Sequence, residues 1–143
     1  MSKVLLITGG ASGIGAETAR LAARQGYKVA INYRSRDAQA MGIAADIAAQ
    51  NGEAIALPGD MASEADIVRM FEETTKALGP LTHLLNSAGI SRQIRVDEYD
   101  AQMLATLFAT MTALAAFLHR GALRARRAEK ILRRGSMRPH KLV

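Results

Sequence analysis

A glycine-rich segment near the start of the chain has the composition and spacing of a phosphate-binding turn. It reads Thr8-Gly9-Gly10-Ala11-Ser12-Gly13-Ile14-Gly15 and follows a short apolar run. Gly9 permits a sharp turn, Gly13 lets backbone approach a diphosphate without an intervening Cβ, and Gly15 lets the next helix pack closely. The free N–H groups and positive dipole end of that helix would then face the phosphate. A purely structural turn is the alternative, but the order strand, turn, helix favours phosphate binding.

Three further polar segments each follow an apolar run, as residues at the carboxyl end of a strand would. They are Asn32-Tyr33-Arg34-Ser35-Arg36, Gly59-Asp60-Met61 and Asn86-Ser87-Ala88-Gly89. Together with the glycine segment, and in this order, they resemble the cofactor motifs of short-chain dehydrogenases/reductases over roughly residues 3–110. This resemblance implies an NAD(P)-dependent oxidoreductase that transfers hydride between a carbonyl and an alcohol, with a small molecule as substrate.

The resemblance also implies which residues contact or brace the cofactor. Asp60 corresponds to the residue that binds the adenine amino group, with the backbone of Met61 helping, although an aspartate in a turn or helix cap is the alternative. Asn86 and the small residues after it would lie beside the cofactor ribose, and Ser87 departs from the family's second asparagine. The full predicted set is Thr8, Gly9, Ser12, Gly13, Ile14, Gly15, Asn32, Arg34, Asp60, Met61, Asn86, Ala88 and Gly89.

The residues that end the second apolar run bear on the choice between NADP and NAD. An acidic residue at this place would hydrogen-bond a ribose 2′-hydroxyl and repel a 2′-phosphate, whereas arginine accommodates the phosphate. The sequence has Arg34 and Arg36 here and no acid before Asp37. We therefore predict NADP, through Arg34 in particular, with NAD as the alternative cofactor. The alternative to a binding role is that both arginines are solvated surface residues.

The catalytic residues of the family cannot be placed on this sequence. The family uses serine, tyrosine and a lysine four positions after the tyrosine for proton transfer. The tyrosines are Tyr27, Tyr33 and Tyr99, and none is followed by lysine at that spacing. The helix asparagine expected near Met111 is also missing, so we predict no catalytic residue. The interpretation is a truncated family member reduced to dinucleotide binding, with residues after about 118 out of frame.

The elements that would hold these motifs alternate along the chain. Short apolar runs at residues 3–8, 28–33, 53–57 and 81–86 predict strands, and residues 16–25, 37–50, 63–78 and 97–118 predict helices. Such alternation is typical of right-handed crossovers in a parallel sheet. We predict an α/β fold with a Rossmann-type doubly wound parallel sheet, incomplete at about four strands in the order 3-2-1-4. Residues 1–118 would form this partial domain, and 119–143 a basic C-terminal tail.

Charge is distributed unevenly along the chain. Residues 1–110 carry 10 Lys+Arg and 12 Asp+Glu, whereas residues 111–143 carry 9 Lys+Arg and one acid. The alternative function is therefore that of a non-enzymatic NADP-binding remnant. Its basic tail would contact nucleic acid or an anionic membrane, although no nucleic-acid motif is present. With no cysteine and scattered histidines we expect no metal site. The uncharged stretch 101–118 is expected to be a buried helix rather than a membrane span. We expect a cytoplasmic protein, and the sequence leaves the oligomeric state open.

Overall fold

A four-stranded parallel sheet forms the centre of the fold. The computed structural model describes residues 2–89, 100–102, 105 and 108. The strands are β1 (Lys3–Thr8), β2 (Tyr27–Tyr33), β3 (Ala54–Pro58) and β4 (His83–Asn86), in the spatial order β3-β2-β1-β4. Their pairing is parallel throughout, so all four carboxyl ends lie at one edge. The predicted fold class and strand order are confirmed.

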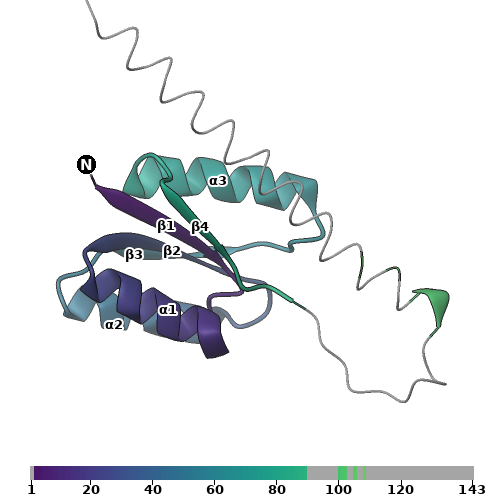
Figure 1. Cartoon of the computed structure of the whole chain (residues 1–143), viewed down its shortest axis with the longest axis horizontal. Helices are drawn as coiled ribbons and strands as arrows, with labels where there is room; N and C mark the ends of the chain where they lie inside the picture. Colours follow the sequence, from purple (N-terminus) through teal and green to yellow (C-terminus); the bar gives the residue numbers. More distant parts are fainter. Residues whose placement is uncertain (1, 90–99, 103–104, 106–107, 109–143) are drawn as a thin grey trace, which may run out of the picture.

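Helices cover both faces of this sheet. The helices α1 (Gly13–Arg24) and α2 (Asp37–Ala49) lie on one face, and α3 (Glu64–Leu78) lies on the other (Figure 1). Alternation along β1 explains the two layers, because Val4 and Leu6 belong to the apolar cluster under α3, while Leu5 and Ile7 belong to the cluster under α1 and α2. A strand that is buried on both faces has the continuous apolar sequence that β1 shows.

The ends of two helices carry residue types that commonly cap helices. The hydroxyl of Ser63 caps α3 by accepting the Asp66 N–H at 3.3 Å, in front of an acidic first turn. Gly26 follows the C-cap of α1 with a φ of +79°, the left-handed conformation that glycine adopts after helices. These two signals fix where α3 begins and where the chain leaves α1 for β2.

Two predicted boundaries differ from the structure by two or more residues, and several others differ by one. The first helix begins at Gly13 rather than at residue 16, because the last residues of the glycine segment already form its first turn. The fourth strand begins at His83 rather than at residue 81, because the Thr82 hydroxyl accepts the Val4 N–H at 2.8 Å where a strand carbonyl would otherwise do so. Most of the predicted helix 97–118 and the whole predicted tail 119–143 lie outside the described residues.

Two glycines offer a test of the helix assignments, because a Cβ at either would meet no atom within 4 Å. Gly42 is exposed in the interior of α2, so Gly42→Ala should raise the free energy of unfolding by about 0.5–1 kcal/mol. Gly26 has a positive φ, so Gly26→Ala should lower it by about 1 kcal/mol. Urea unfolding followed by circular dichroism measures both, and shifts of the same sign would contradict the backbone conformations described here.

Candidate cofactor-binding site

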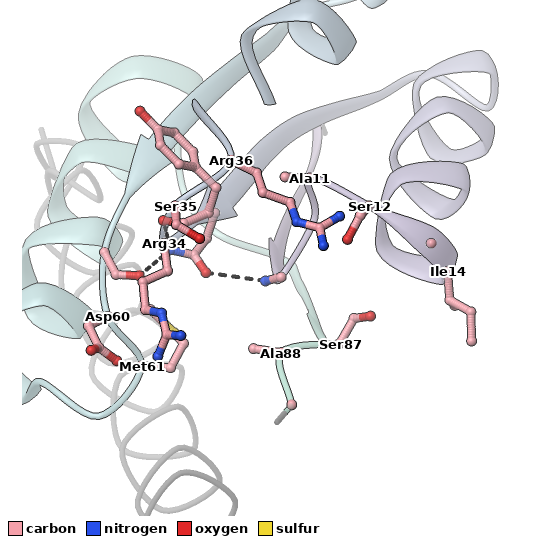
Figure 2. Close-up of a pocket in the computed structure, with 16 residues that line it drawn as sticks. Ala11, Ser12, Ile14, Arg34, Ser35, Arg36, Asp60, Met61, Ser87 and Ala88 are labelled. Carbon is pink, nitrogen blue, oxygen red and sulfur yellow. Dashed lines mark hydrogen bonds between the residues drawn. The ribbon is translucent and has the colours of Figure 1, made fainter. Parts of the chain in front are cut away.

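A pocket of about 640 Å³ opens at the carboxyl ends of the strands. Its lining comes from the segments that follow all four strands, and Figure 2 shows these side chains around a common space. The chain leaves β1 toward β2 on one side, while β4 lies on the other side of β1, so the pocket includes the point where the strand order reverses. Ligands of doubly wound sheets bind at such a point. Its lining residues are Gly9, Ala11, Ser12, Gly13, Ile14, Asn32, Tyr33, Arg34, Ser35, Arg36, Gly59, Asp60, Met61, Ser87, Ala88 and Gly89.

Three glycines of the first motif, Gly9, Gly13 and Gly15, differ in what an added Cβ atom would contact. A Cβ at Gly9 would lie 2.8 Å from the Ala88 Cα, and a Cβ at Gly15 would lie 2.5 Å from the Gly9 carbonyl oxygen. Gly13 has a φ of +54° and no atom within 4 Å of its hypothetical Cβ, so its backbone borders open pocket. Gly15 therefore lets the first turn of α1 pack closely against the backbone of Gly9 and Gly10.

The beginning of α1 has backbone groups available to an anion. The first N–H groups of any helix lack acceptors within the helix. Ser12 occupies the N-cap position, but its side chain makes no capping hydrogen bond. Ser12, Gly13 and Ile14 are all exposed, and all three line the pocket. The residues present therefore fit a phosphate group, because the donors point toward space that no side chain of this turn fills.

Thr8 holds the glycine segment against the end of β4. Its side chain is fully buried, and its hydroxyl donates to Asn86 Oδ1 at 2.8 Å and accepts the Ala88 N–H at 3.2 Å. The Ser87 N–H also donates to the Thr8 carbonyl at 3.2 Å. Thr8, Asn86 and Gly15 do not line the pocket. Their position indicates that they shape the pocket from behind.

Asn32 links the segments that follow β1 and β3. Its side-chain oxygen accepts the Gly9 N–H at 3.2 Å, and its side-chain nitrogen donates to the Gly59 carbonyl at 3.1 Å. The residue is only 2% exposed. Although Asn32 lines the pocket as predicted, its amide is used within the protein, so it contributes by fixing the distance between two walls.

Two arginines follow β2 and are exposed at the pocket. Figure 2 shows the Arg34 guanidinium extending toward Asp60 and Met61, whereas the Arg36 guanidinium extends toward Ser12. Among the described residues, no ion pair involves either arginine. Both positive charges are therefore available to an anionic ligand, at two different places along the pocket.

The segment after β3 supplies the opposite wall. Asp60 Oδ1 accepts the Ala62 N–H at 2.9 Å, which is the turn arrangement weighed as the alternative for this residue. Its side chain nevertheless lines the pocket. Met61 is 5% exposed and packs into the cluster under α3, so its backbone is anchored by its own side chain.

The structure brings together most of the predicted site residues. The pocket contains all of them except Thr8, Gly15 and Asn86. It also contains six residues outside the predicted set, and each is a neighbour of a predicted residue in the same motif: Ala11, Tyr33, Ser35, Arg36, Gly59 and Ser87. In the described part of the chain no three His, Cys, Asp or Glu side chains gather as metal ligands, and no helix could cross a membrane.

Comparisons with known proteins agree with this geometry. A family model described as short chain dehydrogenase matches residues 3–137. The chain belongs to the short chain dehydrogenase family. A dehydrogenase/reductase structure from Sinorhizobium meliloti 1021 superposes with a TM-score of 0.82 at 30% identity, over 87% of this chain and 50% of that one. The family match continues past Met111, where the resemblance was predicted to fade, and the boundary at residue 118 stays a prediction.

Two curated proteins show how much of a relative's length this chain matches. The 3-oxoacyl-[acyl-carrier-protein] reductase of Bos taurus is 42% identical over 92 residues, which are 64% of this chain and 37% of that protein. The short-chain dehydrogenase/reductase homolog YusS of Bacillus subtilis (strain 168) is 31% identical over 101 residues, which are 71% of this chain and 93% of that protein. The chain thus spans well under half of the bovine reductase but matches nearly all of the Bacillus homolog.

The side chain of Asp66 should make the stability of the fold depend on pH. The Asp60 N–H that it accepts lowers its pKa below 3.8, and the hydrogen bond from Arg69 lowers it further. A carboxyl group whose pKa is lower in the folded chain stabilises the fold above its unfolded pKa, and this contribution is lost as the pH falls through the folded pKa.

We therefore expect Asp66→Asn to be less stable than wild type at about pH 7. The gap in melting temperature should close as the pH falls below about 4 and through the lowered pKa of Asp66, because both proteins then lack the negative charge. Thermal unfolding at a series of pH values measures this. A gap that stays constant over that range would show that the charge of Asp66 does not act through the folded state.

Proposed function

We propose that the chain binds NADP in the pocket at the carboxyl ends of its strands, as a member of the short chain dehydrogenase family. The observation that carries this proposal is the combination of an open helix N-terminus at Gly13 with two exposed arginines after β2, neither of which forms an ion pair with another described residue. The helix N-terminus suits a diphosphate, and the arginines suit a further phosphate on the adenosine ribose.

The diphosphate would lie against the first turn of α1. The N–H groups there donate toward the pocket, and the missing Cβ of Gly13 lets the phosphate oxygens approach the backbone. Thr8 and Asn32 support this role because they fix the glycine segment from behind by hydrogen bonds to β4 and from β2. The backbone donors are thus held in position before a ligand arrives, which reduces the ordering cost of binding.

The adenosine half would lie over the ends of β2 and β3. Asp60 and Met61 form that wall, and Arg34 extends toward them. A 2′-phosphate at this place would meet the Arg34 guanidinium, whereas Arg36 extends toward Ser12 and the diphosphate. This placement favours NADP over NAD, because an uncharged 2′-hydroxyl would leave Arg34 without an anionic partner.

The nicotinamide half would extend past Ser87, Ala88 and Gly89 after β4. When bound, the nicotinamide supplies hydride for interconversion of a carbonyl and an alcohol. The residues of this chain bind and orient the dinucleotide. The sequence contains no tyrosine with lysine four positions later to serve as proton donor. We therefore propose dinucleotide binding as the function of these residues, with a small-molecule carbonyl or alcohol as the substrate class of the family.

Calorimetry with NADPH and NADH tests this proposal. We expect NADPH to bind, NADH to bind at least about tenfold more weakly, and NADPH absorbance to stay constant when carbonyl compounds are added. Arg34→Ala should weaken NADPH binding by about 10- to 100-fold, because a charge-assisted contact is lost, while changing NADH binding little.

Arg24→Ala is the matched control, since Arg24 is an exposed arginine in the last turn of α1 and does not line the pocket. It should leave both affinities within about twofold, as expected when one distant surface charge is removed in salt. Flat calorimetric traces with both dinucleotides, on folded protein, would refute the proposed function. Equal effects of the two arginine substitutions would refute the role of Arg34.

A further inference from the structure

One peptide group in the pocket wall is held from both of its sides. The Gly59 carbonyl accepts from Asn32 Nδ2 at 3.1 Å, and the Asp60 N–H of the same peptide donates to Asp66 Oδ2 at 2.8 Å. Because carbonyl and N–H lie in one rigid plane, two partners on opposite edges determine the orientation of that plane. The rotation of this peptide sets the direction in which Asp60 leaves the end of β3.

Asp66 is itself fixed by contacts on α3. Its other carboxylate oxygen, Oδ1, lies 3.0 Å from Arg69 Nη2, and that guanidinium nitrogen also donates to the Pro58 carbonyl at 2.9 Å. The N-cap and the first two turns of α3 thus contact three backbone groups of residues 58–60. These are the Pro58 carbonyl, the Asp60 N–H and, through the Ser63 N–H at 3.0 Å, the Asp60 carbonyl.

The direction of the Asp66 side chain is unusual for its position. Asp66 is three residues after the N-cap Ser63, where an acidic side chain ordinarily returns to the N–H of the capping residue itself. Here the Ser63 N–H is taken by the Asp60 carbonyl, and the Asp66 carboxylate extends beyond the cap to the Asp60 N–H. The carboxylate therefore bonds to the pocket wall, while the Asp66 backbone N–H still donates to the capping hydroxyl of Ser63.

We propose that Asp66 is a positioning residue for the dinucleotide, which acts through the Gly59–Asp60 peptide on the wall that faces the adenosine half. This inference rests on the proposed function, because it assigns the adenosine half to Asp60 and Met61. Asp66 does not line the pocket, so it acts on the ligand only through the loop that it holds. Arg69 supports the same loop at Pro58 and pairs with the Asp66 carboxylate.

The experiment compares Asp66→Ala, Asp66→Asn and the control Glu73→Ala in the full chain. Glu73 lies on the same helix and its Oε1 is 3.5 Å from Arg69 Nη1, but it makes no contact with the loop. Calorimetry uses NADPH and its adenosine fragment 2′,5′-ADP, and amide hydrogen exchange reports on the Asp60 N–H. Binding is measured well below the melting temperature of each variant.

Asp66→Ala should weaken binding of NADPH and of 2′,5′-ADP by the same factor of about ten, and exchange at the Asp60 amide should become faster. Asp66→Asn keeps an oxygen acceptor, so it should recover part of the affinity. Glu73→Ala should leave both affinities within about twofold. These outcomes together would distinguish positioning from a general loss of stability, because Glu73→Ala also removes a partner of Arg69.

Unchanged binding and unchanged Asp60 exchange in a folded Asp66→Ala variant would overturn this inference alone. A loss for NADPH that 2′,5′-ADP does not share would also overturn it, because the effect would then lie outside the adenosine half. If neither Asp66 variant folds while Glu73→Ala does, Asp66 is a determinant of the fold and the inference fails. Wild-type protein that binds neither NADPH nor NADH would overturn the proposed function and this inference together.

Discussion

The buried amide of Asn32 is the interaction on which the shape of the pocket depends. It belongs to the end of β2, accepts from the residue after β1 and donates to the residue after β3. Removing this amide would leave the part-buried Gly9 N–H and the buried Gly59 carbonyl without these partners, and an unsatisfied buried group costs about 1–3 kcal/mol. One side chain thus sets the separation between the glycine segment and the loop that carries Asp60.

Around this link, the motif residues divide into two groups by what they touch. Ser12, Gly13 and Ile14 line the pocket, while Thr8 and Asn86 are hydrogen-bonded to each other behind it. The resemblance to the family assigns all five to cofactor binding without this distinction. In the structure, the first group would meet a ligand and the second keeps β1 and β4 in register at their carboxyl ends.

Much of this arrangement could be predicted from the sequence because its signals are local. Continuous apolar runs gave the strands, the glycine segment gave the turn, and Ser63 followed by acidic residues gave the start of α3. Those signals depend on a few neighbouring residues whose conformational preferences are strong. The strand order also followed, since right-handed crossovers leave few topologies to a chain of alternating elements.

The parts that could not be predicted depend on side chains that meet through the fold. Nothing in the sequence near Asn32 indicates that its amide bonds to Gly9 and Gly59, which are 23 and 27 residues away. An acidic residue such as Asp66 in a first helical turn indicates from sequence only an interaction with the dipole of its own helix, and its contact with the Asp60 N–H requires α3 to return against the end of β3. Boundaries such as the start of β4 failed for the same reason, because a threonine hydroxyl replaced a backbone acceptor.

The hydrogen bonds behind the two walls of the pocket differ in how far apart along the chain their partners lie. The contact that fixes the Asp60 loop joins residues six positions apart, whereas the contact between Thr8 and Asn86 spans 78 positions. Closing a long loop costs more chain entropy than closing a short one, and distant contacts form more slowly during folding. The Asp66 contact within the adenosine wall is therefore local, and we expect it to form more readily than the contact between Thr8 and Asn86. The phosphate wall is complete only when β4 has paired with β1, because Asn86 and Ala88 supply the partners of the Thr8 hydroxyl.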